Sequence, residues 1–283
     1  MKLKKLFNFK LPLWLVLVLV IDAAVLAGLG EYVWWKNQIP PDPAAKVTSI
    51  KLQVLPQTGY TTSLKWGDLG KKLVEAGAID PEKFPFNPSP EDYIKIDEQN
   101  SRDIVNFLWA LGLTQKAQVL DEGPMKKGDT PLGNFASTGG WTLGKKDAVE
   151  LYSSTELFPL NDFQQNLVKK ISDGVFRPCC GNATSFPDCN HGMAALGYIE
   201  WAVYNGLSEE QIYKDLLAFN SFWFPQNYLE MAIFFDKQGI NWKKVDPKLA
   251  LSRDYSSAMG AARIKQEVQN VPGLQSPGSS CGV

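Results

Sequence analysis

The hydrophobic pattern of this chain changes sharply near residue 36. Between Leu11 and Gly30 almost every position is apolar, and Asp22 is the only charged residue in that run. A run of about 20 apolar residues matches the hydrocarbon thickness of a bilayer. Beyond Lys36, apolar residues recur at interrupted spacings instead. The pattern therefore predicts a single N-terminal transmembrane helix followed by a second, differently built part.

Apolar residues three and four positions apart predict that this second part is mainly α-helical. The expected helices cover 63–76, 101–111, 162–175, 225–235 and 255–268, and another follows a capping box at 208–211. Only 46–55 alternates well enough to predict a short strand, so we expect little β-structure.

Residues 193–204 are apolar on nearly all sides, with Glu200 as the only charge. A helix with no polar face is normally surrounded by protein. The sequence thus predicts an irregular helical bundle around one buried central helix.

These patterns divide the chain into four segments. Residues 1–36 form the membrane anchor, and 37–62 form an extended linker that contains a proline-rich stretch and the short strand. Residues 63–270 form the helical exported domain. Residues 271–283 lack an apolar period and form a flexible tail that carries Cys281.

The residues that flank the apolar run predict its orientation in the membrane. Basic residues precede it and aromatic residues follow it: Lys2, Lys4, Lys5 and Lys10, then Tyr32, Trp34 and Trp35. Basic residues favour the cytoplasmic side, and aromatic residues favour the interface. We expect a single-pass protein of the cell membrane that contacts the membrane through residues 11–35. Its N-terminus is cytoplasmic and its main domain extracytoplasmic.

Two features of this run leave alternatives open. The uninterrupted stretch 11–21 also has the length of a signal peptide, and the Val-Leu-Ala sequence at 25–27 resembles a cleavage site. Asp22 is costly in the middle of a bilayer. Its carboxylate either reaches the lipid surface locally or contacts a partner helix in the membrane. Each alternative still exports the rest of the chain.

The formal net charge of −1 serves only to exclude one class of partner. No strongly basic patch accompanies it, and such patches are typical of nucleic-acid-binding proteins. We therefore expect no nucleic-acid partner.

The candidate chemistry gathers in residues 177–193. This stretch holds Cys179, Cys180 and Cys189, the only histidine, His191, and also Met193. The fourth cysteine of the chain is Cys281. Thiolates and imidazoles bind transition metals, and thiolates are also strong nucleophiles. The sequence therefore locates the chemistry more firmly than it identifies it.

The first interpretation is a metal site. Its core ligands are the three clustered cysteines and His191, and Met193 and Cys281 are optional ligands. Thioether and thiolate donors favour Cu(I), and three cysteines with one histidine also form a common zinc site. Residues two apart on a regular helix point to nearly opposite sides. Cys189 and His191 can therefore share one ion only if the regular helix begins near Gly192.

The second interpretation is an extracytoplasmic thiol oxidoreductase with Cys189 as its nucleophile. A cysteine at a helix N-terminus has a stabilised thiolate, and Arg177 and His191 would add positive charge. Cys180 and Cys281 are then the candidate resolving partners. The third interpretation is a protein stapled by disulfides, with a structural or adaptor role and no catalysis.

Four weaker candidates complete the analysis. Glu200 is either a buried general base or a residue that faces solvent or is ion-paired. The glycine-rich stretch 132–144 is read as a tight loop that forms a wall of the site. The aromatic residues between 219 and 228 form either core or a ligand pocket. Residues 182–184 match a glycosylation sequon.

Overall fold

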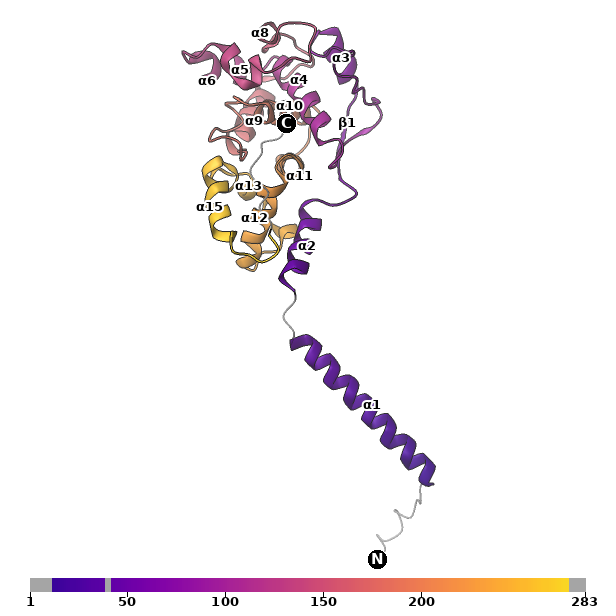
Figure 1. Ribbon diagram of the computed structural model, residues 1–283. Helices are drawn as coiled ribbons and strands as arrows, with labels where there is room; N and C mark the ends of the chain where they lie inside the picture. The colour runs from indigo at the N-terminus through magenta and orange to yellow at the C-terminus, as the bar shows by residue number, and fades with distance from the viewer. Residues whose placement is uncertain (1–11, 39–41, 275–283) are drawn as a thin grey trace, which may run out of the picture.

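The computed structural model describes residues 12–38 and 42–274, and these residues are mostly helical (Figure 1). The longer helices are α1 (Leu13–Gln38), α2 (Pro43–Val54), α4 (Ser101–Thr114), α9 (Asp162–Gly174), α10 (Asn190–Tyr204), α11 (Glu209–Trp223), α12 (Pro225–Lys237) and α15 (Ala258–Val268). Shorter helical segments are α3 (Leu69–Glu75), α5 (Gln118–Asp121), α6 (Pro124–Lys127), α7 (Ala136–Gly139), α8 (Ala148–Leu151), α13 (Pro247–Ala250) and α14 (Arg253–Ser256). Two turns of 3-10 helix are η1 (Leu132–Asn134) and η2 (Trp242–Lys244). The mainly α prediction is confirmed.

Helix α1 contains the apolar run of the sequence. Its segment Leu13–Lys36 is long and apolar enough to cross a membrane, and none of its most apolar window is buried against protein. A signal sequence near an N-terminus has the same length and composition.

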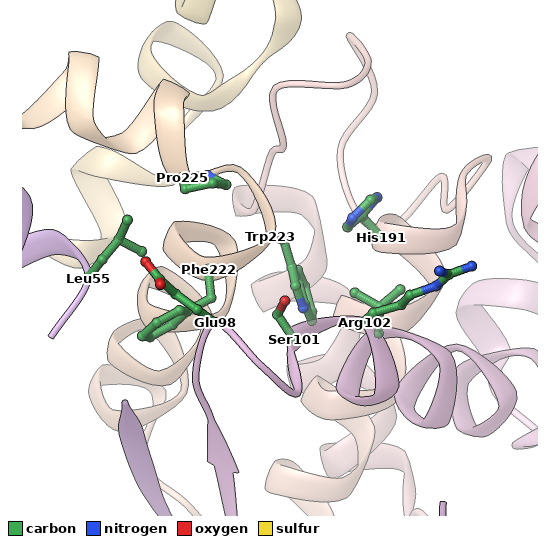
Figure 2. Close-up of a pocket in the computed structure, with 9 residues that line it drawn as sticks. Leu55, Glu98, Ser101, Arg102, His191, Phe222, Trp223 and Pro225 are labelled. Atoms are coloured by element: carbon green, nitrogen blue, oxygen red, sulfur yellow. The ribbon is translucent and has the colours of Figure 1, made fainter. Parts of the chain in front are cut away.

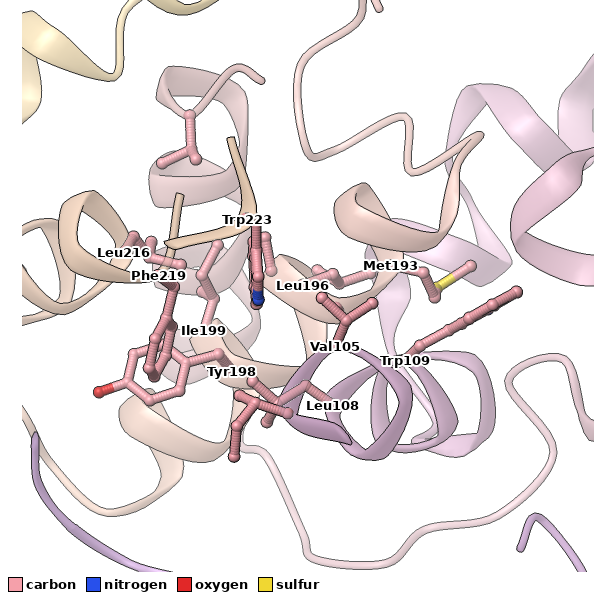
Figure 3. Close-up of a cluster of buried hydrophobic side chains, with 14 of the residues drawn as sticks. Val105, Leu108, Trp109, Met193, Leu196, Tyr198, Ile199, Leu216, Phe219 and Trp223 are labelled. Carbon is pink, nitrogen blue, oxygen red and sulfur yellow. The ribbon is translucent and has the colours of Figure 1, made fainter. Parts of the chain in front are cut away.

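Helix α10 is the buried helix that the sequence predicts, because every residue from His191 to Val203 is buried. It packs most extensively against α4 and also contacts α9, α7 and α11. Figure 3 shows apolar side chains of α4, α10 and α11 meeting in one cluster, which includes Leu108, Leu196 and Phe219.

Two glycines allow the backbones of α4 and α10 to touch. A Cβ at Gly197 would lie 2.5 Å from the carbonyl oxygen of Leu108, and a Cβ at Gly112 would overlap the carbonyl oxygen of Met193. Any larger side chain at either position would push the two helices apart. This close contact fixes α10, and with it the segment that precedes α10.

The predicted strand at 46–55 is wrong, because these residues belong to helix α2. Asp42 caps the helix by accepting a hydrogen bond from the backbone N–H of Ala44, and Pro43 occupies its first turn. The buried residues Val47, Ile50 and Val54 are spaced for one helical face. Leu52, which suggested alternation, is 48% exposed.

The predicted helix at 63–76 is only partly right. Its first three residues lie in strand β1 (Tyr60–Lys65), which pairs antiparallel with β2 (Tyr93–Ile96) and places Tyr60 opposite Ile96. Gly67 has a φ of +57°, which separates this strand from helix α3. Gly77, with a φ of +77°, follows α3 as the sequence indicates. This hairpin is the only sheet in the part of the chain that the structure describes.

The other predicted helices are confirmed, with ends that differ by a few residues. Ser208 caps α11 by accepting from the N–H of Gln211, and Pro225 opens α12. The helix predicted at 255–268 is divided, because Ser257 adopts an extended conformation and caps α15.

The segment 175–189 joins α9 to α10 without regular structure, yet backbone hydrogen bonds fix it to three other parts of the fold. Phe176 donates to the carbonyl of Leu251, and Ala258 donates to the carbonyl of Cys180. Ser137 of α7 donates to the carbonyl of Asp188. The cysteine-rich stretch is therefore held in place rather than left as a loose loop.

Candidate metal centre

Three cysteine sulfurs meet at the entrance to helix α10. The Sγ atoms of Cys179, Cys180 and Cys189 all lie within 4.8 Å of one another. The Sγ atoms of Cys179 and Cys189 are 3.4 Å apart. All three cysteines are half-buried and are free thiols. The structure thus brings together the three cysteines that the sequence singles out.

The local fold explains how the three sulfurs converge. Cys189 is the N-cap of α10, where its Sγ accepts a hydrogen bond from the N–H of Gly192 at 3.4 Å. Cys179 and Cys180 lie in a turn after Arg177, and the N–H of Cys180 donates to the Arg177 carbonyl. The turn and the cap lie side by side, so residues ten apart in sequence share one site.

The Arg177 guanidinium is buried beside the sulfurs, with 1% of the residue exposed. Its Nε donates to Cys189 Sγ at 3.1 Å, and its Nη2 donates to Asp188 Oδ1 at 2.7 Å. It also donates to the carbonyls of Asn182 and Phe186. A buried arginine whose guanidinium donates hydrogen bonds to several acceptors is a fixed positive charge.

Gly192 makes room for this guanidinium. A Cβ at Gly192 would lie 2.5 Å from Arg177 Cζ and 2.7 Å from its Nε. The close approach therefore needs a residue without a side chain at the third position of α10.

The three thiols differ in acidity because they share hydrogen bonds. Hydrogen bonds from Cys179 and Cys180 hold the pKa of Cys189 well below its ordinary value, and Arg177 adds to this against the effect of burial. Hydrogen bonding to Cys180 and Cys189, together with burial, raises the pKa of Cys179. For Cys180, the hydrogen bond with Cys179 lowers the pKa, but Cys189 and burial outweigh it and raise the pKa to about 11. Cys189 is therefore the most acidic thiol of the group.

The donor set fits a thiophilic metal ion. Zinc held at about 2.3 Å by tetrahedral thiolates separates its sulfurs by about 3.8 Å. The observed group spans at most 4.8 Å, with its Cys179–Cys189 pair at 3.4 Å. Thiolate sulfur selects Cu(I), zinc and iron–sulfur clusters over hard cations.

The structure does not bring His191 into this group of ligand atoms. His191 lies inside the first turn of α10, where its ring packs against Phe224 and Trp223. Its Nε2 is buried and has no hydrogen-bond partner among the described residues. Burial, with a smaller contribution from Arg177, lowers the pKa of His191 to about 4, so the ring is neutral.

The two optional ligands have different outcomes. Met193 is fully buried in the apolar contact between α10 and α4, where Figure 3 shows it beside Trp109. Cys281 lies outside the described residues. No disulfide joins the described cysteines, since all three of them are free.

The weaker candidates are also placed by the structure. Both carboxylate oxygens of Glu200 are buried without a partner among the described residues, and burial raises its pKa well above the ordinary value. The carboxyl is therefore not ion-paired as one interpretation expected. The glycine-rich stretch forms η1 and α7 and touches the site through Ser137. Thr184 of the sequon is fully buried, and Asn182 Nδ2 donates to Asp188 Oδ2 at 2.8 Å.

Sequence reasoning foresaw Arg177 and Gly192 as neighbours of the sulfurs. The aromatic residues between 219 and 228 are buried, and two of them, Phe222 and Trp223, also line a pocket (Figure 2). Sequence reasoning missed that His191 and residues of α4 share this pocket. Glu98 and Arg102 line it from a segment about 90 residues earlier, and no local pattern in the sequence connects the two.

No protein-family model, no curated protein and no solved structure matches this chain. The function must therefore be argued from the site itself.

Proposed function

We propose that this chain is a membrane-anchored protein that binds one transition metal ion, copper or zinc, in an extracytoplasmic helical domain. Cys179, Cys180 and Cys189 are its ligands in this proposal. The observation that carries it is the meeting of three free sulfurs within 4.8 Å at the start of a buried helix.

Three sulfurs at one point support a metal ion better than a structural disulfide. One disulfide within the cluster would use only two of the three sulfurs. A metal ion uses all three, and thiolates are the donors that copper and zinc prefer. The buried arginine and the backbone fixation of 175–189 hold the ligands in place before an ion arrives.

The proposed location depends on α1. Its length and composition suit a membrane span, and the lysines before it favour a cytoplasmic N-terminus. The proposal includes a polar contact between Asp22 and a partner helix, because an isolated carboxylate in the bilayer is costly.

Elemental analysis of the full chain, purified in detergent without chelator, tests the metal proposal. We expect about one equivalent of copper or zinc, with the thiols of the cluster protected from alkylation until the metal is removed. Cys179→Ser, Cys180→Ser and Cys189→Ser should each lower the stoichiometry or affinity. Gly181→Ala is the matched control, because a Cβ there meets no atom within 4 Å.

Further variants separate the ligand sets. His191→Ala, Met193→Leu and Cys281→Ser should retain the metal if the three cysteines suffice. If His191→Ala were the only one of these three variants to lose the metal, His191 would be a fourth ligand beside the three cysteines. A chain that binds neither copper nor zinc with its thiols reduced would refute the metal proposal.

A second candidate, thiol–disulfide exchange, is favoured by the 3.4 Å between the Cys179 and Cys189 sulfurs. The Cys189 thiolate would attack a partner disulfide, forming a mixed disulfide and releasing one partner thiolate. Cys179 would then attack Cys189 Sγ, leaving a Cys179–Cys189 disulfide and the second partner thiol. Cys179→Ser should trap the mixed disulfide on non-reducing gels, a result that a purely metal-binding site would not give.

A further inference from the structure

The ligand atoms gathered at the entrance to α10 are all sulfur. The Sγ atoms of Cys179, Cys180 and Cys189 lie within 4.8 Å of one another, and no histidine nitrogen or carboxylate oxygen of the described residues joins them. His191 is two residues from Cys189, but its ring packs against Phe224. Zinc sites usually complete a set of three cysteines with a histidine, a fourth cysteine or another ligand. The described part of this site therefore offers three soft donors and no hard one.

The carboxylate nearest to the cluster in sequence is already engaged. Asp188 precedes Cys189, yet its Oδ1 accepts a hydrogen bond from Arg177 Nη2 at 2.7 Å and its Oδ2 accepts one from Asn182 Nδ2 at 2.8 Å. The Arg177 guanidinium is buried, so moving the carboxylate onto a metal ion would leave a buried charge without one of its acceptors. Such a loss costs more than the loss of a hydrogen bond between neutral groups. The buried arginine thus holds this oxygen ligand away from the three sulfurs.

The surrounding fold supports the three sulfurs unequally. Cys189 Sγ accepts hydrogen bonds from Arg177 Nε at 3.1 Å and from the Gly192 N–H at 3.4 Å. Cys179 packs against the hydrophobic core. Cys180 is the least buried of the three cysteines, and its hydrogen bond outside the cluster runs to a backbone carbonyl and is 3.9 Å long. Cys180 therefore lies on the open side of the site.

We propose that the ion bound here is Cu(I), coordinated by these three sulfurs alone, with Cys180 as the ligand that exchanges with an incoming thiol. This inference rests on the proposed metal function and names the ion that the site carries. Cu(I) is a soft ion that is stable with two or three thiolates. An ion in the plane of three sulfurs, at about 2.3 Å from each, separates them by about 4.0 Å. The observed spacing, 3.4 Å for one pair and 4.8 Å at most, brackets this value. It brackets the zinc spacing too, so the number and kind of ligands decide for Cu(I).

Release of the ion from such a site needs no change in its oxidation state. An incoming thiol of a partner loses its proton, and its sulfur binds Cu(I). The bond between Cu(I) and Cys180 then breaks, and the Cys180 thiolate takes up a proton. Cys179 and Cys189 keep the ion during this first exchange, because the fold supports their sulfurs more firmly. The site thus suits an ion that is taken up and passed on.

X-ray absorption at the copper edge tests the coordination, on the full chain in detergent loaded anaerobically with about one equivalent of Cu(I). We expect three sulfur neighbours around copper and no nitrogen or oxygen neighbour. The spectrum should be the same for His191→Ala and for Cys281→Ser. When the metal-free protein is offered Cu(I) and Zn(II) in equal amounts, Cu(I) should fill the site and Zn(II) should stay in solution.

Two variants and a labelling experiment test the separate roles of the sulfurs. Cys180→Ser should still bind Cu(I), now with two sulfur neighbours. Cys189→Ser should weaken Cu(I) binding by about 10-fold more than Cys180→Ser does, the effect of one hydrogen bond to a charged group, in competition with a Cu(I) chelator. Iodoacetamide should modify Cys180 of the Cu(I)-loaded parent before the other two cysteines, as read by mass spectrometry. Gly181→Ala is the control and should behave as the parent, because a Cβ there meets no atom within 4 Å.

Several results would overturn this inference. A nitrogen or oxygen neighbour on copper, or the loss of a sulfur neighbour in Cys281→Ser, would show that the three sulfurs are not the complete ligand set. First modification at Cys179 or Cys189 would remove the role given to Cys180. A protein that binds Zn(II) but not Cu(I) would overturn the identity of the ion and leave the proposed metal function standing, whereas a protein that binds neither would refute both.

Discussion

Replacing Gly192 with alanine should disrupt the cysteine site without removing any of its functional groups. The added Cβ would lie 2.5 Å from Arg177 Cζ and Nη2. Ordinary contacts begin near 3.4 Å, so the guanidinium would have to withdraw by about 1 Å. It cannot swing into solvent, because Arg177 is 1% exposed and donates four hydrogen bonds.

The geometry predicts which hydrogen bond is lost first. Cys189 Sγ lies against Gly192 and accepts a hydrogen bond from the Gly192 N–H at 3.4 Å. A guanidinium that retreats from Gly192 therefore also retreats from Cys189, and its 3.1 Å hydrogen bond stretches beyond the useful range. A lost hydrogen bond to a charged group costs about 1.5–3 kcal/mol. The higher helix propensity of alanine offsets at most about 1 kcal/mol of this loss in the free energy of unfolding. We expect a net loss of about 0.5–2 kcal/mol, rising to about 2–5 kcal/mol if a second hydrogen bond of Arg177 also breaks.

Urea denaturation of the full chain in detergent, followed by tryptophan fluorescence, measures this free energy of unfolding. Iodoacetamide alkylation of the metal-free protein across pH gives a second readout. Arg177 helps to lower the pKa of Cys189. Withdrawal of the guanidinium should therefore shift the rise in alkylation rate to higher pH. Gly181→Ala is the control and should stay within about 0.5 kcal/mol of the parent. A Gly192→Ala protein with parental stability and an unchanged alkylation profile would refute the role given to Arg177.

Three further predictions concern the body of the domain. Gly112→Ala should cost about 3 kcal/mol or more, because its Cβ meets the backbone of α10 rather than a movable side chain; Gly133→Ala is the control, and equal melting temperatures would contradict the close helix contact. Glu200 has a raised folded-state pKa, so the unfolded chain loses this proton first as pH rises, and stability should fall by up to about 1.4 kcal/mol per pH unit once the pH exceeds the ordinary glutamate pKa of about 4.3. Glu200→Gln should remove that slope in urea titrations, and an unchanged slope would show that Glu200 is not the cause. Tyr60→Phe removes a 2.6 Å hydrogen bond to the buried Asp215 and should lower the free energy of unfolding by about 1–2 kcal/mol, whereas no change would mean that Gln211 and Tyr198 satisfy the carboxylate without it.

Two of the correctly predicted helices have both a periodic face and a start signal. Ser208 and Pro225 fix where α11 and α12 begin, and the apolar period fixes which faces are buried. Apolar spacing alone was sufficient for α4, but it failed at 46–55. Residues 47, 50, 52 and 54 fit a strand as well as a helix, and the capping by Asp42 decides for the helix.

The hairpin was missed for a different reason. Its two strands are separated by 27 residues, and each is too short to show a clear alternation. The strands are also held by contacts with residues far away in sequence, such as the hydrogen bond from Trp201 Nε1 to the Lys65 carbonyl. Local spacing carries no information about such contacts.

The site shows the same division between local and distant information. Clustering in the sequence located the three sulfurs, because the turn at Cys179 and the cap at Cys189 are only ten residues apart. It also placed His191 with them, on the condition that regular helix begins near Gly192. In the structure α10 begins at Asn190 with Cys189 as its N-cap, so His191 already lies on the helix. Residues two apart near a helix start face different neighbours, and the first turn therefore directs Cys189 to the sulfurs and His191 to Phe224 and Trp223. A shift of two residues in the start of one helix thus separates His191 from the three cysteine sulfurs.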